Sequence, residues 1–135
     1  LAHGIGKVSN NYDNLSTFYN DLKKWNIPFN NQIKTSLLNI SDKSLNTYGA
    51  VSEEIALEMA TNIRNKTKSD IGLSSTGISG PEGGSKEKPV GLVYIGLVTP
   101  VISSVKIYDF NFGRDIHREM TSTAALNITR LSLED

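Results

Sequence analysis

The sequence predicts an α/β fold with a mixed sheet in one domain that spans residues 1–135. The length is the first observation, because 135 residues are enough for one core but not for two. Segments with helical periodicity alternate with strand-like segments, which is the second. The third is the nearly unbroken apolar stretch 90–98. It is too short to span a bilayer and is typical of a strand buried on both faces.

The first two elements are expected to be helices. A helix from about residue 13 to 25, behind an Asp13 cap, is predicted because its apolar residues recur with a helical period: Leu15, Phe18, Tyr19 and Leu22. Apolar residues between 33 and 40 indicate a short second helix. Ser41 or Asp42 is placed to cap a further turn.

A longer helix is predicted from Glu53 to about Lys66, with Ser52 as its N-cap. Carboxylates fill its first turn and cations its last, as the helix dipole favours. Its buried stripe is expected to be Ile55, Met59, Ala60 and Ile63.

The second half is expected to be strand-rich and to end in a helix. A strand over Asp70–Ser75 leads into a glycine-rich segment, Thr76–Lys88, and then into the 90–98 strand. After a turn at Thr99-Pro100, a strand over Val101–Phe112 is predicted to form an antiparallel hairpin with 90–98. A final helix spans about Asp115–Leu131, and the residues expected to face inward are Ile116, Met120, Ala124 and Leu131.

Composition excludes several classes of function. The 14 basic and 14 acidic residues balance, which argues against a protein that coats DNA or a membrane surface. The sequence has no cysteine, which excludes disulfides, zinc–thiolate sites, iron–sulfur clusters and cysteine nucleophiles. With only His3 and His117 as imidazoles, a multi-histidine metal site is excluded as well.

The glycine-rich segment is the candidate ligand site. Glycines allow close approach of a backbone to a ligand and present N–H groups to an anion. The segment is not a Walker A loop, because it lacks Gly-Lys-Ser/Thr. It is not a dinucleotide-binding fingerprint either, because its glycines are spaced differently. Composition alone is equally compatible with a ligand cradle and with a flexible turn.

Residues 47–94 closely resemble the CinA C-terminal domain family. The resemblance rests on the order and spacing of several segments: Thr47-Tyr-Gly-Ala-Val-Ser-Glu-Glu54, Met59-Ala60, Asp70-Ile-Gly-Leu-Ser-Ser-Thr-Gly-Ile-Ser-Gly-Pro-Glu-Gly-Gly84, Lys88-Pro-Val-Gly91 and Val93-Tyr94. A weaker match follows at Phe110, Arg114 and Arg118, where Phe112-Gly113 stands in place of the family's Gly-Asp.

The resemblance implies a three-layer domain and an amidohydrolase ancestry. Characterised members hydrolyse the carboxamide of nicotinamide mononucleotide to the acid and ammonia, without a metal or other cofactor. A Ser nucleophile is activated by a Lys, with a Tyr nearby. A neutral hydroxyl attacks an amide poorly without a base, and a Lys serves as that base only when desolvation lowers its pKa.

This chain departs from the family at the residues that carry the chemistry. The family's Tyr-Ser-Asn-Glu-x-Lys segment corresponds to residues 29–34, where Lys34 keeps the base but Phe29 lacks the hydroxyl. An ungapped count places Ala2 at the nucleophilic Ser, and Ser-Cys-Thr-Gly-Gly occurs nowhere in the chain. The chain begins with Leu1 rather than Met, so an omitted upstream segment is expected and is the alternative source of that motif.

The resemblance also assigns a ligand loop and one arginine. The substrate-binding candidates are Thr76, Gly77, Gly80, Gly83, Gly84 and Arg114. Arg114 and Arg118 lie one turn apart, so either can pair with a phosphate, or both can be surface or subunit-interface residues.

Other residues are expected to be structural or inert. Lys88, Pro89 and Gly91 are interpreted as structural. His3, near the terminus, is expected to be inert, and His117 is expected to be a surface residue on the last helix. The hydroxyls of Ser74, Ser75 and Ser79 are weak candidates for a replacement nucleophile, because no base is paired with them in the sequence.

Three functions remain open. The favoured one is a diverged family member that binds a small nucleotide, such as nicotinamide mononucleotide, with weak or lost amidase activity. The second is an active nicotinamide mononucleotide amidohydrolase, and the third is an interaction protein related to competence or DNA damage. We further expect a cytoplasmic homo-oligomer that contacts neither membranes nor, given its neutral charge, nucleic acid directly.

Overall fold

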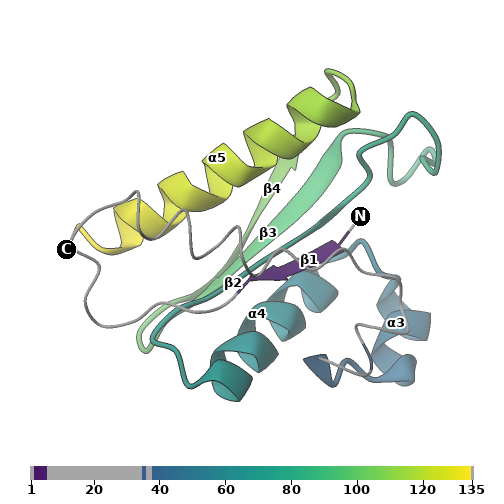
Figure 1. The fold of residues 1–135 in the computed structure, drawn as a ribbon. Coiled ribbons are helices and arrows are strands. Elements are labelled where there is room, and N and C mark those ends of the chain that lie inside the picture. Colours follow the sequence, from purple (N-terminus) through teal and green to yellow (C-terminus); the bar gives the residue numbers. More distant parts are fainter. Residues whose placement is uncertain (1, 6–34, 36–37, 135) are drawn as a thin grey trace.

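The computed structural model describes residues 2–5, 35 and 38–134. These residues form three layers, with helix α5 on one face of a sheet and helix α4 on the other (Figure 1). The predicted helix at 13–25 and most of the short helix predicted after it lie outside the described residues. The α/β fold is confirmed.

The sheet contains four described strands: β1 (Ala2–Ile5), β2 (Gly72–Gly77), β3 (Leu92–Val98) and β4 (Ser103–Asp109). Their spatial order is β1-β2-β3-β4, and every pairing is antiparallel. We predicted a mixed sheet, and for the described strands this is wrong. Consecutive strands β2, β3 and β4 are joined by loops rather than by crossover helices, and a loop connection returns the chain in the opposite direction.

The hairpin predicted from the second half of the sequence is confirmed. Strands β3 and β4 pair from Leu92 opposite Asp109 to Val98 opposite Ser103. The turn between them is closed by Thr99, whose N–H donates to the Ile102 carbonyl at 2.7 Å and whose Oγ1 accepts from the Ile102 N–H at 2.9 Å.

Helix α4 (Glu53–Thr67) follows the short helix α3 (Asp42–Tyr48), and both begin at the predicted serine caps. The Ser41 hydroxyl accepts from the Ser44 N–H at 3.0 Å, and the Ser52 hydroxyl accepts from the Ile55 N–H at 3.3 Å. The predicted stripe of α4 is buried. Three of its residues, Ile55, Met59 and Ile63, form the first core cluster together with Leu38, Ile40 and Leu45.

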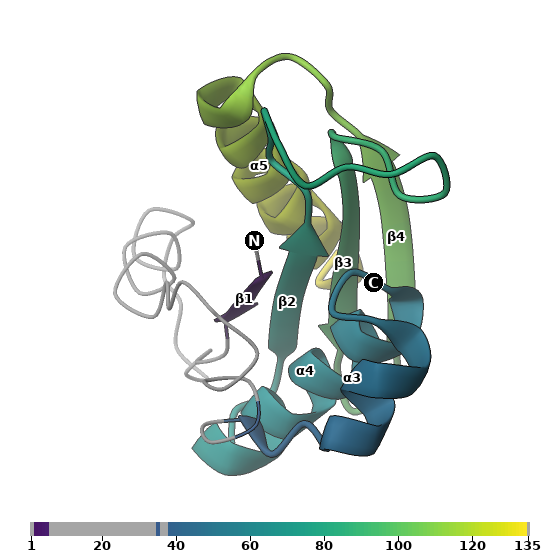
Figure 2. The ribbon, with the colours of Figure 1, turned by 90° about the vertical axis from the view of Figure 1, so that its right-hand side faces the viewer.

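Small residues on β2 and β3 let α4 lie close to the sheet, and Figure 2 shows α4 beside these strands. The Ser74 hydroxyl donates to the Ala56 carbonyl of α4 at 2.5 Å. A Cβ on Gly96 would lie 2.6 Å from the same carbonyl oxygen. Side chains larger than these would therefore push helix and sheet apart.

Helix α5 (Arg114–Ser132) covers the opposite face of the sheet. There it meets the second core cluster, whose members are Ile71, Leu73, Val93, Ile95, Leu97 and Ala125.

The inward face predicted for α5 is wrong at Ile116 and Leu131, whereas Ala124 packs against the second core cluster as predicted. The helix buries His117, Thr121, Ala125 and Thr129, whereas Ile116 is 52% and Leu131 48% exposed. Met120 and Ala124 are half-buried.

Polar residues can face the sheet because the helix itself satisfies their hydroxyls. Thr121 Oγ1 donates to the His117 carbonyl at 2.7 Å, and Thr129 Oγ1 donates to the Ala125 carbonyl at 2.8 Å. A threonine bonded in this way presents mainly its methyl group to its neighbours. The apolar stripe that hydrophobic periodicity detects is consequently the outer one.

Candidate functional site

The candidate site centres on the β2–β3 loop, residues 78–91, which leaves the sheet beside the N-terminus of α5. Residues 81–87 of this loop are exposed. The Gly80-Pro81 peptide bond is cis, and Gly80, Gly83 and Gly91 have positive φ angles of 77°, 93° and 101°. These three positions therefore require glycine for the path of the backbone.

Most glycines of this region are also required by the chain's own contacts. A Cβ on Gly80 would lie 2.5 Å from Val90 Cγ1, and one on Gly84 would lie 2.8 Å from the Val90 N atom. A Cβ on Gly77 would lie 2.6 Å from the Leu92 carbonyl oxygen. Only Gly83 among the four predicted ligand-loop glycines is open, its nearest neighbour being Ile78 Cγ2 at 3.9 Å.

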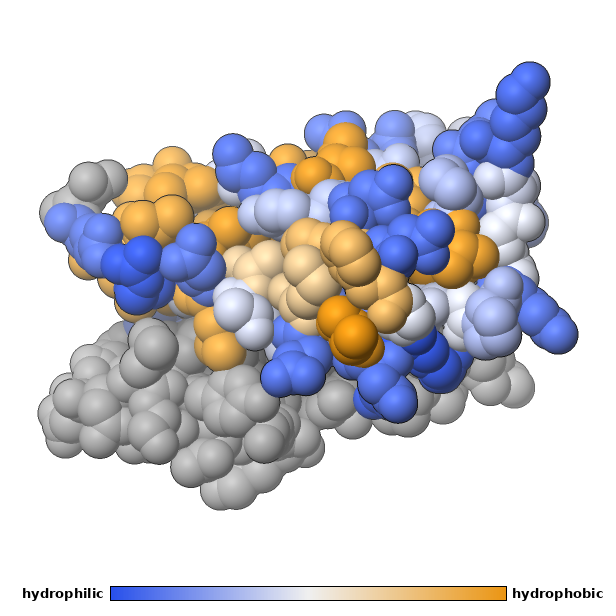
Figure 3. Space-filling view, turned by 90° about the horizontal axis from the view of Figure 1, so that it is seen from above, coloured by the Kyte–Doolittle hydropathy of each residue, from blue (hydrophilic) through white to orange (hydrophobic). Residues whose placement is uncertain are grey.

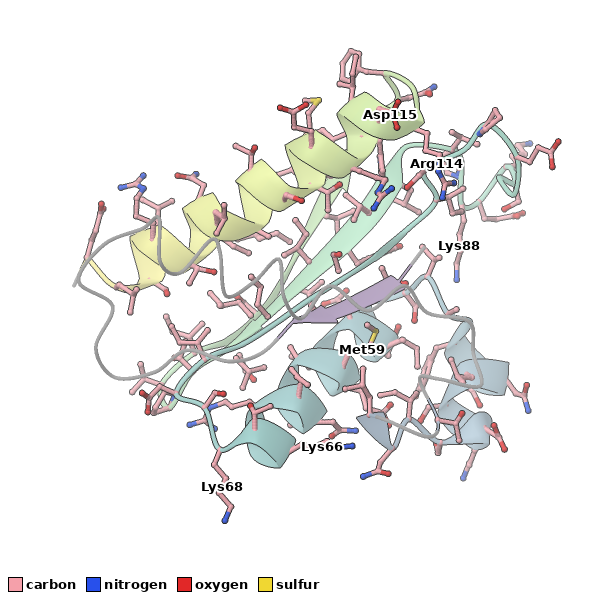
Figure 4. All side chains as sticks on the ribbon, viewed as in Figure 1. Met59, Lys66, Lys68, Lys88, Arg114 and Asp115 are labelled. Carbon is pink, nitrogen blue, oxygen red and sulfur yellow. The ribbon has the colours of Figure 1, made fainter. Side chains whose placement is uncertain are left out.

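Two cations fasten the loop to the helices around it (Figure 4). Arg114, at the first position of α5, donates from Nη1 to the Gly80 carbonyl at 3.2 Å. Lys88 donates from Nζ to the Tyr48 carbonyl at the end of α3, at 3.1 Å. The structural interpretation of Lys88 agrees with this contact, which is also electrostatically favourable because a helix C-terminus attracts cations.

The exposed tip of the loop keeps donors available. Among the described residues, the N–H groups of Glu82, Gly83 and Gly84 donate to no backbone acceptor. The nearby N-terminus of α5 begins at Gly113, which supplies no side-chain cap. Free N–H groups, a helix N-terminus and the Arg114 guanidinium together favour a negatively charged group.

The hydroxyl groups of Ser74 and Thr76 in β2 make structural hydrogen bonds. Thr76 is fully buried, and its Oγ1 donates to the Ala50 carbonyl at 2.6 Å, so its hydroxyl is committed to the connection between α3 and α4. Ser74 is likewise fully buried and bonded to α4. Ser75 and Ser79 are each 6% exposed. A buried hydroxyl that already donates to a carbonyl makes a poor nucleophile.

The three residues of the family's chemistry are only partly described. The backbone of Ala2 lies in β1 opposite Thr76, directly beside the start of the β2–β3 loop. Lys34 and Phe29 lie outside the described residues. The position assigned to the nucleophile and the predicted ligand loop are therefore neighbours across the β1–β2 pairing.

His117 was predicted to be a surface residue, and this is wrong because its side chain is only 3% exposed. Its Nδ1 lies 3.1 Å from the Phe110 carbonyl oxygen, and its ring makes an edge contact with the Phe110 ring. Burial lowers the pKa of this imidazole, and the contact with the carbonyl opposes that shift in part. The one signal in the sequence for its burial is that His117, Thr121 and Ala125 are spaced four residues apart and therefore lie on one face of α5.

The described residues contain neither a membrane-spanning helix nor a metal-ligating cluster. None of their helices has both the length and the apolar character needed to cross a membrane. No group of three or more histidine, aspartate or glutamate side chains gathers there in a way that would hold a metal ion.

Comparison with known proteins identifies close relatives. The model of a family described as the CinA C-terminal domain matches residues 14–133. A competence-damage inducible protein of Caldanaerobacter subterraneus is 45% identical over 108 residues, which is 80% of this chain. A protein of the same name from Caldicellulosiruptor bescii is 47% identical over 111 residues, 81% of this chain. The chain spans about a quarter of the length of these relatives, 26% in both cases.

Solved structures agree with this assignment. The competence/damage inducible protein CihA from Agrobacterium tumefaciens superposes with a TM-score of 0.74 at 32% identity. The match covers 77% of this chain and 64% of that protein. A CinA superfamily protein from Enterobacter cloacae superposes with a TM-score of 0.77 over 89% of this chain and 75% of that protein. Its identity is 23%, so it supports the fold alone.

Proposed function

Because the chain belongs to the CinA C-terminal domain family, we propose that it binds a small nucleotide, such as nicotinamide mononucleotide, with weak or lost amidase activity. The observation that carries the proposal is the β2–β3 loop. Its exposed tip has N–H groups that donate to no backbone acceptor among the described residues, and Arg114 and Lys88 hold the loop to α5 and α3.

The phosphate of the nucleotide is the group that this arrangement suits best. Backbone N–H groups and a guanidinium recognise phosphate oxygens, and neither needs a metal. Arg114 uses one of its five N–H donors for the Gly80 carbonyl, which leaves donors for a ligand while the loop stays anchored. The open position at Gly83 would let a ligand approach the backbone closely.

Loss of chemistry is supported by the sequence beside this loop. Hydrolysis of a carboxamide by the family route requires a hydroxyl nucleophile, a base and N–H donors for the oxyanion. The assigned nucleophile position is Ala2, whose methyl group cannot attack a carbonyl, and it lies opposite Thr76. Lys34 keeps the base, and Phe29 lacks the hydroxyl of the family's Tyr. Binding without efficient turnover is the expected outcome.

Titration calorimetry with nicotinamide mononucleotide tests the binding. Arg114→Gln should weaken binding about tenfold, because a charge-assisted hydrogen bond contributes roughly 1.5–3 kcal/mol. Arg118→Gln is the matched control, one turn further along the same helix and exposed. Equal affinity for both variants would argue against the proposed phosphate contact.

Ammonia release tests the chemistry. The chain, its Lys34→Ala variant and an intact family enzyme are incubated with the same nucleotide. We expect turnover only from the intact enzyme. Turnover by the chain that disappears in Lys34→Ala would identify an active amidohydrolase. It would mean either that the Ala2 assignment is wrong or that another nucleophile serves.

The same two assays also test the alternative that the chain is an interaction protein. The absence of both binding and turnover from a folded sample would favour the interaction-protein alternative. Neutral net charge argues against a direct contact with nucleic acid. A cytoplasmic location stays a prediction of the cysteine-free sequence.

A further inference from the structure

The first turn of α5, residues 114–117, lies beside the β2–β3 loop without a local cap. Gly113 precedes it with a φ of 91° and supplies no side-chain hydrogen bond, in contrast to the serines that cap α3 and α4. The end of the molecule with the loop and this turn is mainly hydrophilic in the view from above, while hydrophobic side chains gather further along, toward the middle (Figure 3). The orientation of the turn therefore depends on contacts with other elements.

Two side chains of this turn make such contacts in the described part of the chain. Arg114 donates from Nη1 to the Gly80 carbonyl, near the start of the loop, at 3.2 Å. His117 follows three residues later, and its Nδ1 lies 3.1 Å from the Phe110 carbonyl oxygen. Because residues three apart are neighbours on a helix surface, both contacts hold the turn from the same side.

Phe110 belongs to the segment that closes the loop. Its N–H donates to the Gly91 carbonyl at 2.8 Å, and the Gly91 N–H donates to the Ile78 carbonyl at 2.7 Å. These bonds join the two ends of the loop to each other and to the residue that follows β4. His117 therefore reaches the last residue of the loop through Phe110, while Arg114 reaches its beginning.

We propose, on the basis of the proposed nucleotide binding, that His117 is a positioning residue of this site. It holds the first turn of α5 against the Phe110 carbonyl and thereby keeps the Arg114 guanidinium at the loop, where it meets the phosphate. The His117 side chain is 3% exposed, so it acts through Arg114 rather than on the ligand. A turn that is already held in place lowers the entropic cost of ordering the arginine when the ligand binds.

Amide hydrogen exchange tests the connection without any ligand. His117→Leu removes the donor but keeps an apolar side chain, and it should speed exchange of the Gly91 and Phe110 N–H groups about fivefold. Thr121→Val is the matched control, since Thr121 is buried one turn further along the same face and its hydroxyl donates to its own helix. This control should leave exchange of the two N–H groups unchanged. Equal acceleration in both variants, or none in His117→Leu, would overturn the proposal.

Rescue variants separate the hydrogen bond from the packing of the ring. His117→Asn places an amide nitrogen at the same number of bonds from the backbone as Nδ1, so it should restore slow exchange. His117→Gln places its nitrogen further out, as Nε2 is, and should not restore it. The glutamine variant also takes the place of His117→Leu if the latter does not fold. Exchange that is no slower in His117→Asn than in His117→Gln would overturn the proposal.

Binding of nicotinamide mononucleotide shows whether the connection acts through Arg114. Titration calorimetry should give an affinity about three- to tenfold weaker for His117→Leu, the effect of one neutral hydrogen bond. In an Arg114→Gln background the same substitution should change the affinity less than about twofold, because the residue that it positions is already gone.

The outcomes of this binding experiment are distinguishable. Equal losses in both backgrounds would contradict the positioning role alone, since His117 would then act independently of Arg114. A wild-type chain that does not bind the nucleotide would contradict the proposed function and this role with it.

Discussion

At the scale of single residues, His117 links the strands to the last helix. The Phe110 carbonyl can only accept, so the contact with Nδ1 places the proton of the neutral imidazole on Nδ1. The ring is 3% exposed, which makes the charged form costly in the folded protein. Folding therefore selects the neutral histidine.

A pH dependence of stability follows from this burial. The pKa of His117 is lowered in the folded state, so between that pKa and the unfolded value of about 6.5 the unfolded chain binds more protons. The free energy of unfolding should rise with pH through this window and level off above it. Lowering the pH below about 6.5 should cost stability.

Urea unfolding at several pH values measures the effect in the wild-type chain and in His117→Gln. The variant should be less stable at neutral pH and should lose this part of the pH dependence. Parallel pH profiles for the two proteins would contradict the assignment to His117.

At the scale of elements, the cap of α4 connects the helix to the preceding turn. The Ser52 hydroxyl accepts from the Ile55 N–H and donates to the Gly49 carbonyl at 2.9 Å. Ser52 itself is 5% exposed. Its loss leaves a buried N–H and a carbonyl without their partner, which costs more than the loss of an exposed cap.

We therefore expect Ser52→Ala to destabilise the chain by about 1–2 kcal/mol. Ser41→Ala, which removes the exposed cap of α3, should cost about half as much. Thermal and urea unfolding of the two variants provide the comparison. A larger loss for Ser41→Ala would show that burial does not control the strength of these caps.

At the scale of the whole molecule, the distance between α4 and the sheet depends on glycines in the strands. The carbonyls of Ala56 and Ala60 in α4 lie directly over β3 and β2, where Gly96 and Gly72 leave room for them. A methyl group on Gly96 would meet the Ala56 oxygen at 2.6 Å and the Ser74 hydroxyl at 2.7 Å. The Ala56 oxygen belongs to the helix backbone and the Ser74 hydroxyl is bonded to it, so the helix itself would have to move.

Gly96→Ala should accordingly cost about 3 kcal/mol, at the upper end of overpacking effects. Gly113→Ala is the informative control. Its φ of 91° strains any other residue, but no atom lies within 4 Å of its added Cβ, so it should cost only about 1–2 kcal/mol. Equal losses in urea unfolding would mean that the spacing of α4 and the sheet is adjustable.

The sequence by itself determined the features that depend on neighbouring residues. Ser41 and Ser52 cap their helices and the Thr99 turn closes the hairpin, because each depends on contacts within a few residues. The buried stripe of α4 was predicted from the helical spacing of its apolar residues. The order and spacing of residues 47–94 also indicated the family that the comparisons confirm.

The tertiary structure alone decided which surfaces meet. Hydrophobic periodicity selected the outer stripe of α5, whereas the sheet accepted His117 and two threonines whose polar atoms bond to nearby backbone carbonyls. It also showed that Gly77, Gly80 and Gly84 are needed by the chain itself, while Gly83 is open. The reason is physical: a side chain's burial depends on the surface that another layer offers, and that surface is assembled from residues far away in the sequence.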